Sequence, residues 1–168
     1  ELSSFYRAAT QLLTFSNLEE LAQQIAENLV IEFDFVDCSV LLLDKSLKLH
    51  NGAVPKKDLE NNQLVRYGFA GEFKHNVMQK IPLNGNGLIV AAVRTNQIIY
   101  SPNVQLDIRY ISNDDKTATE MVIPLRVGDE ILGALDMQSP NHNAFDGRAM
   151  AVAQVFAAHA SLALFNGL

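Results

Sequence analysis

The chain has 168 residues, of which 48% are hydrophobic and 19% are charged. This length fits one domain with one core, and the balance of apolar and charged residues excludes a disordered chain. Basic residues number 13 against 19 acidic ones, giving a net charge of -6, and they are scattered along the chain. The sequence therefore predicts no nucleic-acid partner.

The cysteine count and the hydropathy pattern indicate in which cellular compartment the protein lies. Cys38 is the one cysteine, so no disulfide can form within the chain. No run approaches the ~20 consecutive apolar residues of a membrane span. We therefore expect a cytoplasmic domain that makes no membrane contact.

Apolar residues at helical spacing predict two helices at the start of the chain. The first covers Phe5 to Leu13. The second begins near Asn17, because Ser16 and Glu19 have the spacing of a capping box, in which each side chain accepts a hydrogen bond from the other residue's amide.

From Asp37 onward the pattern is typical of strands. The run Cys38 to Asp44 predicts a central strand that turns into a partner at Leu47 to Leu49. Residues 53–80 contain Val54-Pro55 and two glycines, and they predict a long loop.

The second half predicts further strands and two helices. The expected elements are a helix at Leu88 to Thr95, a strand at Gln97 to Tyr100, a polar loop to Lys116, a hairpin of Thr119 to Val127 with Ile131 to Gln138, and an alanine-rich helix from an Asp146 N-cap to Phe165. Helices at both ends of an antiparallel sheet favour an α+β fold.

The same half carries a series of short motifs whose order and spacing are specific only when taken together. They are Ile81 to Gly87, Asp107 to Tyr110, Thr117 to Leu125, Ile131 to Ser139 and Asn143 to Asp146. In these motifs the chain resembles the GAF family, strongly from Ile81 onward and more loosely before it. The resemblance implies a central antiparallel sheet with the terminal helices packed on one face. A lid of loops and short helices would then cover a ligand pocket on the other face.

The resemblance also implies a function. Residues 1–168 would form one GAF-like domain, excised from a longer multidomain protein, that senses a small molecule and regulates an output domain in the same chain. Histidine kinases, cyclases, phosphodiesterases and transcription regulators contain such domains. We expect no enzymatic activity, because the branch of the family that reduces free methionine sulfoxide relies on several cysteines.

No cofactor is specified by the sequence. Covalent bilin attachment is not expected, because it requires a cysteine in or near the lid and Cys38 lies in the predicted central strand. Weighed against the small-molecule sensor are two alternatives. One is a homodimerisation module that pairs its terminal helices and fills its pocket with its own aromatic side chains. The other is a haem-based sensor with a histidine ligand such as His159.

The candidate ligand-binding residues fall in two groups. Asp107, Arg109 and Tyr110 lie in a short loop that could present a cation and a phenol to an anionic or planar ligand, although the first two could equally brace the loop. The second group leads into the next strand, where alternation places Thr119 and Met121 on the face opposite Glu120. If the Thr119 face is the pocket face, the ligand would meet Thr117, Thr119 and Met121.

Overall fold

The computed structural model describes residues 7–8, 17–111 and 116–167. The predicted helix from Phe5 to Leu13 therefore lies outside the described residues, except for Arg7 and Ala8, which are helical. Ala8 is fully buried in the main core.

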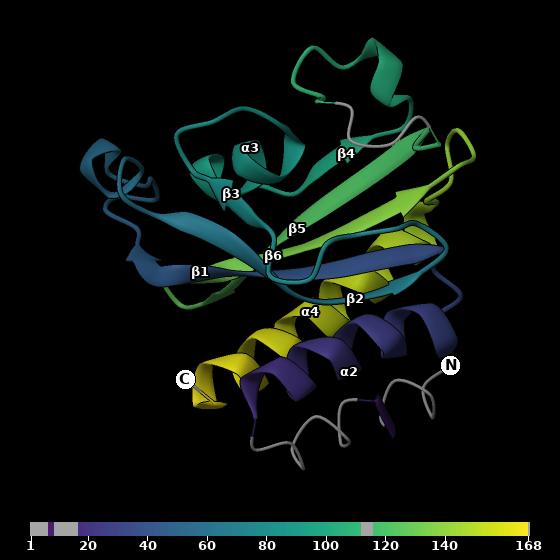
Figure 1. Cartoon of the computed structure of the whole chain (residues 1–168), viewed down its shortest axis with the longest axis horizontal. Helices are drawn as coiled ribbons and strands as arrows, with labels where there is room; N and C mark the ends of the chain where they lie inside the picture. The colour runs from purple at the N-terminus through teal and green to yellow at the C-terminus, as the bar shows by residue number, and fades with distance from the viewer. Residues whose placement is uncertain (1–6, 9–16, 112–115, 168) are drawn as a thin grey trace.

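One six-stranded antiparallel sheet forms the middle layer, with the strand order β3-β2-β1-β6-β5-β4 (Figure 1). The strands are β1 (Asp37–Lys48), β2 (Gln63–Gly71), β3 (Lys80–Pro82), β4 (Ile99–Ser101), β5 (Thr119–Val127) and β6 (Glu130–Ser139). The helices are α2 (Leu18–Ile31), α3 (Leu88–Thr95) and α4 (Gly147–Gly167), with single 3-10 turns η2 (Lys56–Asp58) and η3 (Val104–Leu106). This architecture confirms the predicted α+β fold.

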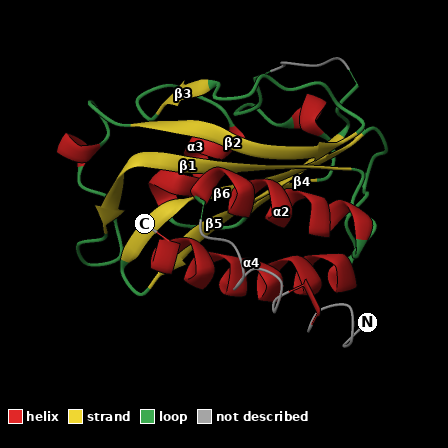
Figure 2. Cartoon of the chain, turned by 60° about the horizontal axis from the view of Figure 1, so that its bottom comes forward, coloured by secondary structure: helices red, strands yellow, loops and turns green. Residues whose placement is uncertain are grey.

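Helices α2 and α4 lie side by side on one face of the sheet, and α3 lies on the other (Figures 1 and 2). The main core fills the space between the two long helices and the sheet, where Ile25 and Phe156 pack against Val40, Met121 and Leu135. A second apolar cluster packs α3 against the opposite face.

Helix α2 begins where the sequence predicts, but with a different cap. The side chain of Asn17 accepts hydrogen bonds from the amides of Glu19 and Glu20 at 2.8 and 3.2 Å. An asparagine oxygen satisfies the free amides of the first turn in this way. Asn17 is therefore the N-cap, and the predicted partner Ser16 lies outside the described residues.

Helix α2 meets β2 at very short range. A Cβ atom at Gly68 would lie 2.6 Å from the backbone of Ala22 and Gln23, so only glycine allows this approach. The Gln23 side chain donates to the carbonyl of Phe69 at 2.8 Å and accepts from its amide at 3.0 Å. Both bonds form close to a bulge in the pairing of β1 with β2, which lies between Val40 and Leu41.

Helix α4 is long and apolar enough to cross a membrane by length and composition alone. The core helices of globular domains share that character. In this chain α4 contributes six buried side chains against the sheet and α2, namely Ala153, Phe156, Ala157, Ala160, Ser161 and Leu164.

Two sequence predictions for the first half were wrong. Strand β1 continues through Asp44 to Lys48 and does not turn there, because the Asn62 side chain holds the polar segment by donating to the Lys45 carbonyl at 2.6 Å. Residues 53–80 are not one loop, since they contain β2 and β3. The pattern of β2 is hidden because Arg66 is directed into the interior and Gly68 lies under α2.

The later elements follow the prediction closely. Helix α3 has the predicted bounds, and the hairpin of β5 and β6 and the helix α4 are present. The Asp146 side chain accepts from the Ala149 amide at 2.8 Å, which is the predicted N-cap bond of α4. These segments were predictable because their signals are local.

The contact of Gly68 with α2 gives a prediction about stability. We expect Gly68→Ala to lower the free energy of unfolding by about 1–3 kcal/mol, because the new methyl group forces α2 away from β2. Gly147→Ala is the matched control, since a Cβ there meets no atom within 4 Å. Urea denaturation measures both, and equal stability of the two variants would contradict the proposed close packing.

Candidate ligand site

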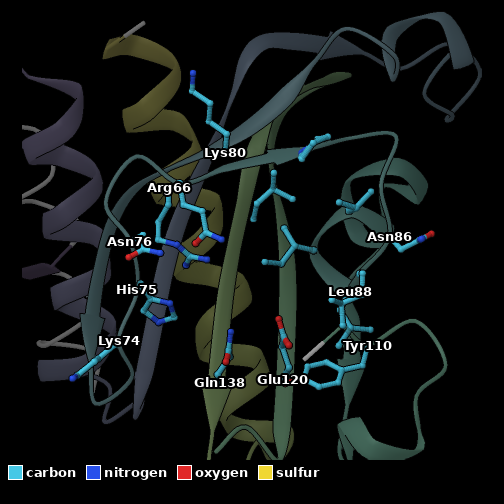
Figure 3. Close-up of a pocket in the computed structure, with 17 residues that line it drawn as sticks. Arg66, Lys74, His75, Asn76, Lys80, Asn86, Leu88, Tyr110, Glu120 and Gln138 are labelled. Atoms are coloured by element: carbon cyan, nitrogen blue, oxygen red, sulfur yellow. The ribbon is translucent and has the colours of Figure 1, made fainter. Parts of the chain in front are cut away.

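A cavity of about 390 Å³ lies on the face of the sheet opposite α2 and α4. This volume falls in the usual range for small-molecule sites, ~300–1,000 Å³. Figure 3 shows Arg66 and His75 on one side, Leu88 and Tyr110 on the other, and Glu120 from β5 and Gln138 from β6 on the floor between them. Residues 74–82 and the start of α3 complete the wall.

The register of the sheet makes the floor of this cavity polar. Ser39 pairs with Asp136, while Gln138 pairs with both Asp37 and Glu120, and directly opposed residues share a face. Charged side chains are almost never this deeply buried unless they have partners. Four are at most 4% exposed here, namely Asp37, Arg66, Glu120 and Asp136.

Arg66 is the buried cation of the group. Its Nη1 donates to Ser39 Oγ at 2.5 Å, and its Nε has no acceptor among the described residues. Burial lowers the pKa of Arg66, and the carboxylates of Asp136 and Asp37 raise it in part. A guanidinium does not lose its proton in a protein, so the positive charge remains at the cavity wall.

Glu120 and Asp136 form a pair of neighbouring carboxyl groups. Gln138 Nε2 donates to Asp136 Oδ2 at 2.7 Å. No amide, hydroxyl or cationic group of the described residues donates to Asp136 Oδ1. Burial, followed by the charge of Asp136 and a hydrogen bond to it, raises the pKa of Glu120 well above its ordinary value. The neutral, protonated form of Glu120 is therefore favoured.

His75 and Asp37 fasten the segment after β2 to the sheet. The distance from His75 Nε2 to Asp37 Oδ2 is 2.7 Å, and the Phe73 amide donates to Asp37 Oδ1 at 3.1 Å. The edge of the imidazole contacts the ring of Phe69, with centroids 5.5 Å apart. This wall of the cavity is thus held by hydrogen bonds to β1.

Of the predicted residues, Tyr110 lines the cavity beside α3 and Thr117 contacts a residue of its floor. Thr117 is buried, and its hydroxyl donates to Gln138 Oε1 at 2.6 Å, which orients the Gln138 amide toward Asp136. Thr117 therefore supports the floor from behind.

Asp107 and Arg109 are paired with each other. Arg109 donates from Nε to Asp107 Oδ1 at 2.9 Å and from Nη2 to Oδ2 at 2.7 Å, and this side-chain bond is the main reason that the pKa of Asp107 falls to about 2. Neither residue lines the main cavity, although Arg109 borders a neighbouring hollow beside α3. The geometry supports the bracing role, and ligand binding by Arg109 stays a prediction.

Thr119 and Met121 point away from the cavity, so their assignment to the pocket was wrong. Met121 packs in the core under α2 and α4. The Thr119 hydroxyl lies 2.5 Å from the Asn141 carbonyl and 3.0 Å from the Pro102 carbonyl, joining two loops at the end of the sheet. Both faces of β5 are buried, and the pocket face is the one that carries Glu120.

Sequence reasoning missed Arg66, His75, Glu120 and Asp136. The available signal was a charge inside an apolar strand run, as in Leu135-Asp136-Met137. Such a charge costs too much free energy to bury without a partner, and it therefore indicates a polar site.

The structure also shows where the residues invoked for the two alternative functions, the self-filled dimerisation module and the haem sensor, lie. For the module that fills its own pocket, the aromatic side chain of Tyr110 lines the cavity, whereas those of Phe69, Phe73 and Tyr100 do not. His159 lies exposed on α4, on the far side of the sheet, and His75 is the histidine at the cavity. Cys38 is buried on the helix side of β1, where burial raises the pKa of its thiol.

The arrangement of an antiparallel sheet with two long helices on one face is shared with known proteins. The family model described as "GAF domain" matches residues 16–164. The chain belongs to the GAF domain family. No curated protein sequence matches it significantly.

Solved GAF-fold structures superimpose on nearly the whole chain. The GAF domain of the Acinetobacter phosphoenolpyruvate-protein phosphotransferase has 14% identity and a TM-score of 0.77, covering 98% of this chain and 92% of its own. A free methionine-R-sulfoxide reductase from Neisseria meningitidis, in complex with its substrate, has 16% identity and a TM-score of 0.76, covering 97% and 87%. The type II reductase from Thermoplasma acidophilum has 22% identity and a TM-score of 0.67, covering 89% and 96%.

These structures correct the expectation that the chain is not an enzyme. The methionine-R-sulfoxide reductases are enzymes, and they have the same fold as this GAF domain. At 16% and 22% identity they establish the fold alone, and the fold is compatible with both regulation and catalysis.

Because the pKa of Glu120 is raised, we expect the stability of the domain to depend on pH. A carboxyl whose pKa is higher in the folded state than its ordinary 4.5 contributes stability that is complete below about pH 4.5 and is lost as the pH rises through the folded pKa. A glutamine at this position would not titrate. We therefore expect the melting temperature of Glu120→Gln, relative to the unsubstituted domain, to rise as the pH increases above 4.5.

Thermal unfolding followed by circular dichroism at a series of pH values measures this difference. Glu60→Gln, which removes an exposed carboxylate in the same way, is the control. A flat difference for Glu120→Gln would show that Glu120 titrates like a surface residue.

Proposed function

We propose that this GAF domain is a regulatory domain that senses a small polar molecule bound in the cavity. The observation that carries the proposal is the buried Arg66 Nε, which has no acceptor among the described residues, beside a cavity of ligand size. A buried donor costs about 1–3 kcal/mol when it is left unsatisfied. A polar occupant that supplies the missing acceptor recovers this free energy.

The sheet offers a route from the cavity to the helices. Strand β5 presents Glu120 and strand β6 presents Gln138 to the cavity, and the adjacent residues Met121 and Met137 pack in the core under α2 and α4. A ligand that shifts these strands also repacks the helices. Coupling between two sites is typically ~1–3 kcal/mol, enough to change an output several-fold.

The proposal includes an output domain in the same chain and a cytoplasmic location. The likeness to a GAF domain of a phosphotransferase supports the regulatory role, and the reductase structure with its substrate supports a small-molecule site in this fold. A chain with one cysteine, which lies buried, is consistent with a reducing compartment.

Mass spectrometry of the purified domain, first under native and then under denaturing conditions, tests the proposal. We expect a small molecule that stays bound in the native spectrum and is released on denaturation. Arg66→Gln should lose it, and the control Arg126→Gln should keep it because Arg126 is exposed and lies outside the cavity lining. An empty parent protein that the small-molecule fraction of a cell extract does not stabilise against heat would contradict the proposal.

A specific feature of α4 supports homodimerisation as a second function. Five exposed apolar residues are spaced alternately by four and three positions, which is the pattern of a coiled-coil seam. They are Ala151, Val155, Ala158, Leu162 and Phe165. Arg148 is the one charged residue in α4, so two copies of this stripe could pair without repulsion between like charges along it.

The mass of the domain in solution tests the dimer. We expect light scattering during size-exclusion chromatography to give twice the chain mass for the parent and the single mass for Leu162→Glu. Leu162 is 53% exposed, so this substitution should leave the monomer folded. Gln154→Glu, also on α4 but off the stripe, is the control and should remain dimeric. A parent domain that is monomeric would rule out this pairing.

A further inference from the structure

We propose that the loop of residues 104–111 and one side of helix α3 form a docking surface for an acidic, apolar peptide segment of a partner protein. The loop lies on the same face of the sheet as α3, away from α2 and α4 (Figure 1). It contains Asp107 and Arg109, which pair with each other and do not line the ligand cavity. The role of this surface is independent of the function proposed for the cavity.

The loop presents three large apolar side chains to solvent. Leu106 is 80% exposed, Ile111 is 50% exposed and Ile108 between them is fully exposed. Single apolar residues are common on protein surfaces, but a contiguous group of them indicates a contact with another molecule. Full burial of one such side chain contributes ~1.5–3 kcal/mol, so a partner that covers this group gains affinity from it.

Hydrogen bonds brace the loop before any partner binds. Asn103 caps η3 by accepting from the Gln105 amide at 3.2 Å. The Asp107 carboxylate accepts from the Arg109 amide at 3.0 Å, in addition to its two bonds with the guanidinium. Val104 anchors the start of the loop in the apolar cluster under α3. A loop that is already ordered loses less conformational entropy on binding, which favours association.

A hollow of about 370 Å³ between the loop and α3 makes this surface concave. Its apolar lining consists of Val90, Ala91, Ile108 and Ile111. Two arginines, Arg94 and Arg109, also line it, and none of the described residues in the lining is acidic. The hollow adjoins the ligand cavity, because Val90 and Ile111 line both.

The charges at the hollow favour an acidic partner. Arg94 is exposed, and its guanidinium contacts the neutral carbonyl of Gly85 at 3.4 Å. The whole domain has a net charge of -6, but exposed charges more than ~8 Å away are largely screened at physiological salt. The nearby arginines therefore set the sign of the partner's charge. Complementary charge supplies specificity and a faster association, while the apolar contacts supply most of the affinity.

Two other occupants match this surface less well. A lipid surface is flat and would leave the hollow unfilled. A second copy of this chain in a two-fold contact would place the same patch on both sides, so that Arg94 would face the arginines of the other copy. An extended or helical peptide can insert an apolar side chain into the hollow and place a carboxylate beside Arg94.

Selection of peptides against the whole chain tests the surface. The probe is a phage-displayed library of short peptides of random sequence. We expect the selected peptides to combine aspartate or glutamate with leucine, isoleucine or phenylalanine. Fluorescence anisotropy of a labelled synthetic copy of one selected peptide then gives its Kd for the parent chain and for each variant.

Variants assign the binding to this surface. Ile108→Ser and Arg94→Gln should each weaken the selected peptide about tenfold or more. The matched controls are Ile31→Ser and Arg126→Gln, which change an exposed isoleucine and an exposed arginine elsewhere and should leave the Kd unchanged. All of these positions are exposed, so the variants should fold like the parent, and circular dichroism checks this.

A double-mutant cycle assigns the charge. Replacing an acidic residue of the peptide by its amide should weaken binding to the parent chain several-fold. For one acidic position, the same replacement should have little further effect on binding to Arg94→Gln, because the partner of that carboxylate is already absent. Additive losses at every acidic position would contradict the pairing with Arg94.

Four outcomes would overturn the docking surface. Selected peptides that are basic or uncharged, or a selection that yields no binder, remove the acidic partner. A selected peptide that binds Ile108→Ser as tightly as the parent binds elsewhere on the chain. Vesicles of anionic phospholipid that bind the parent but not Ile108→Ser assign the loop to a lipid surface. A solution mass that falls on the Ile108→Ser change assigns it to a second copy of this chain.

Discussion

The alternation of side chains along β1, β5 and β6 is the constraint on which the rest of this structure depends. Successive residues of a strand point to opposite faces, and in these strands both faces are covered. One face carries apolar residues such as Val40, Met121 and Leu135, which pack under α2 and α4. The other carries Ser39, Glu120 and Asp136, which require polar surroundings. The same strands therefore fix a dry core on one side and a polar cavity on the other.

The contrast between the faces also explains which parts of the fold were predictable. Helix α3 and the hairpin of β5 and β6 follow from local patterns, and their bounds agree with the sequence to within one residue. Strand β2 was missed because its pattern is interrupted twice, by Arg66 facing the cavity and by Gly68 under α2. Neither cause is visible without the partner element. Tertiary contacts determine the secondary structure of such segments, and the intrinsic strand propensity of their residues does not.

The pocket face was misjudged for a related reason. Thr119 and Glu120 are both buried, so alternation within β5 separates the two faces without saying which one meets a ligand. The family resemblance placed the pocket opposite the terminal helices, but it did not give the register of β5. That choice depends on pairing with β6, which aligns Glu120 with Gln138 and places both at the cavity floor. The charge of the neighbouring Asp136 was the stronger clue.

Arg66 is held through its main chain as well as its side chain. Its amide donates to the Gln79 carbonyl at 2.9 Å, and its carbonyl accepts from the Met78 amide at 2.8 Å. The segment after β2, which forms one wall of the cavity, is therefore hydrogen-bonded to the residue whose side chain lines that cavity. Local opening of this segment breaks these two bonds. An occupant of the cavity that contacts both Arg66 and the segment holds the bonds closed, and it thus slows the exchange of the Met78 amide proton with solvent. That one amide becomes a reporter of occupancy that needs no knowledge of the ligand.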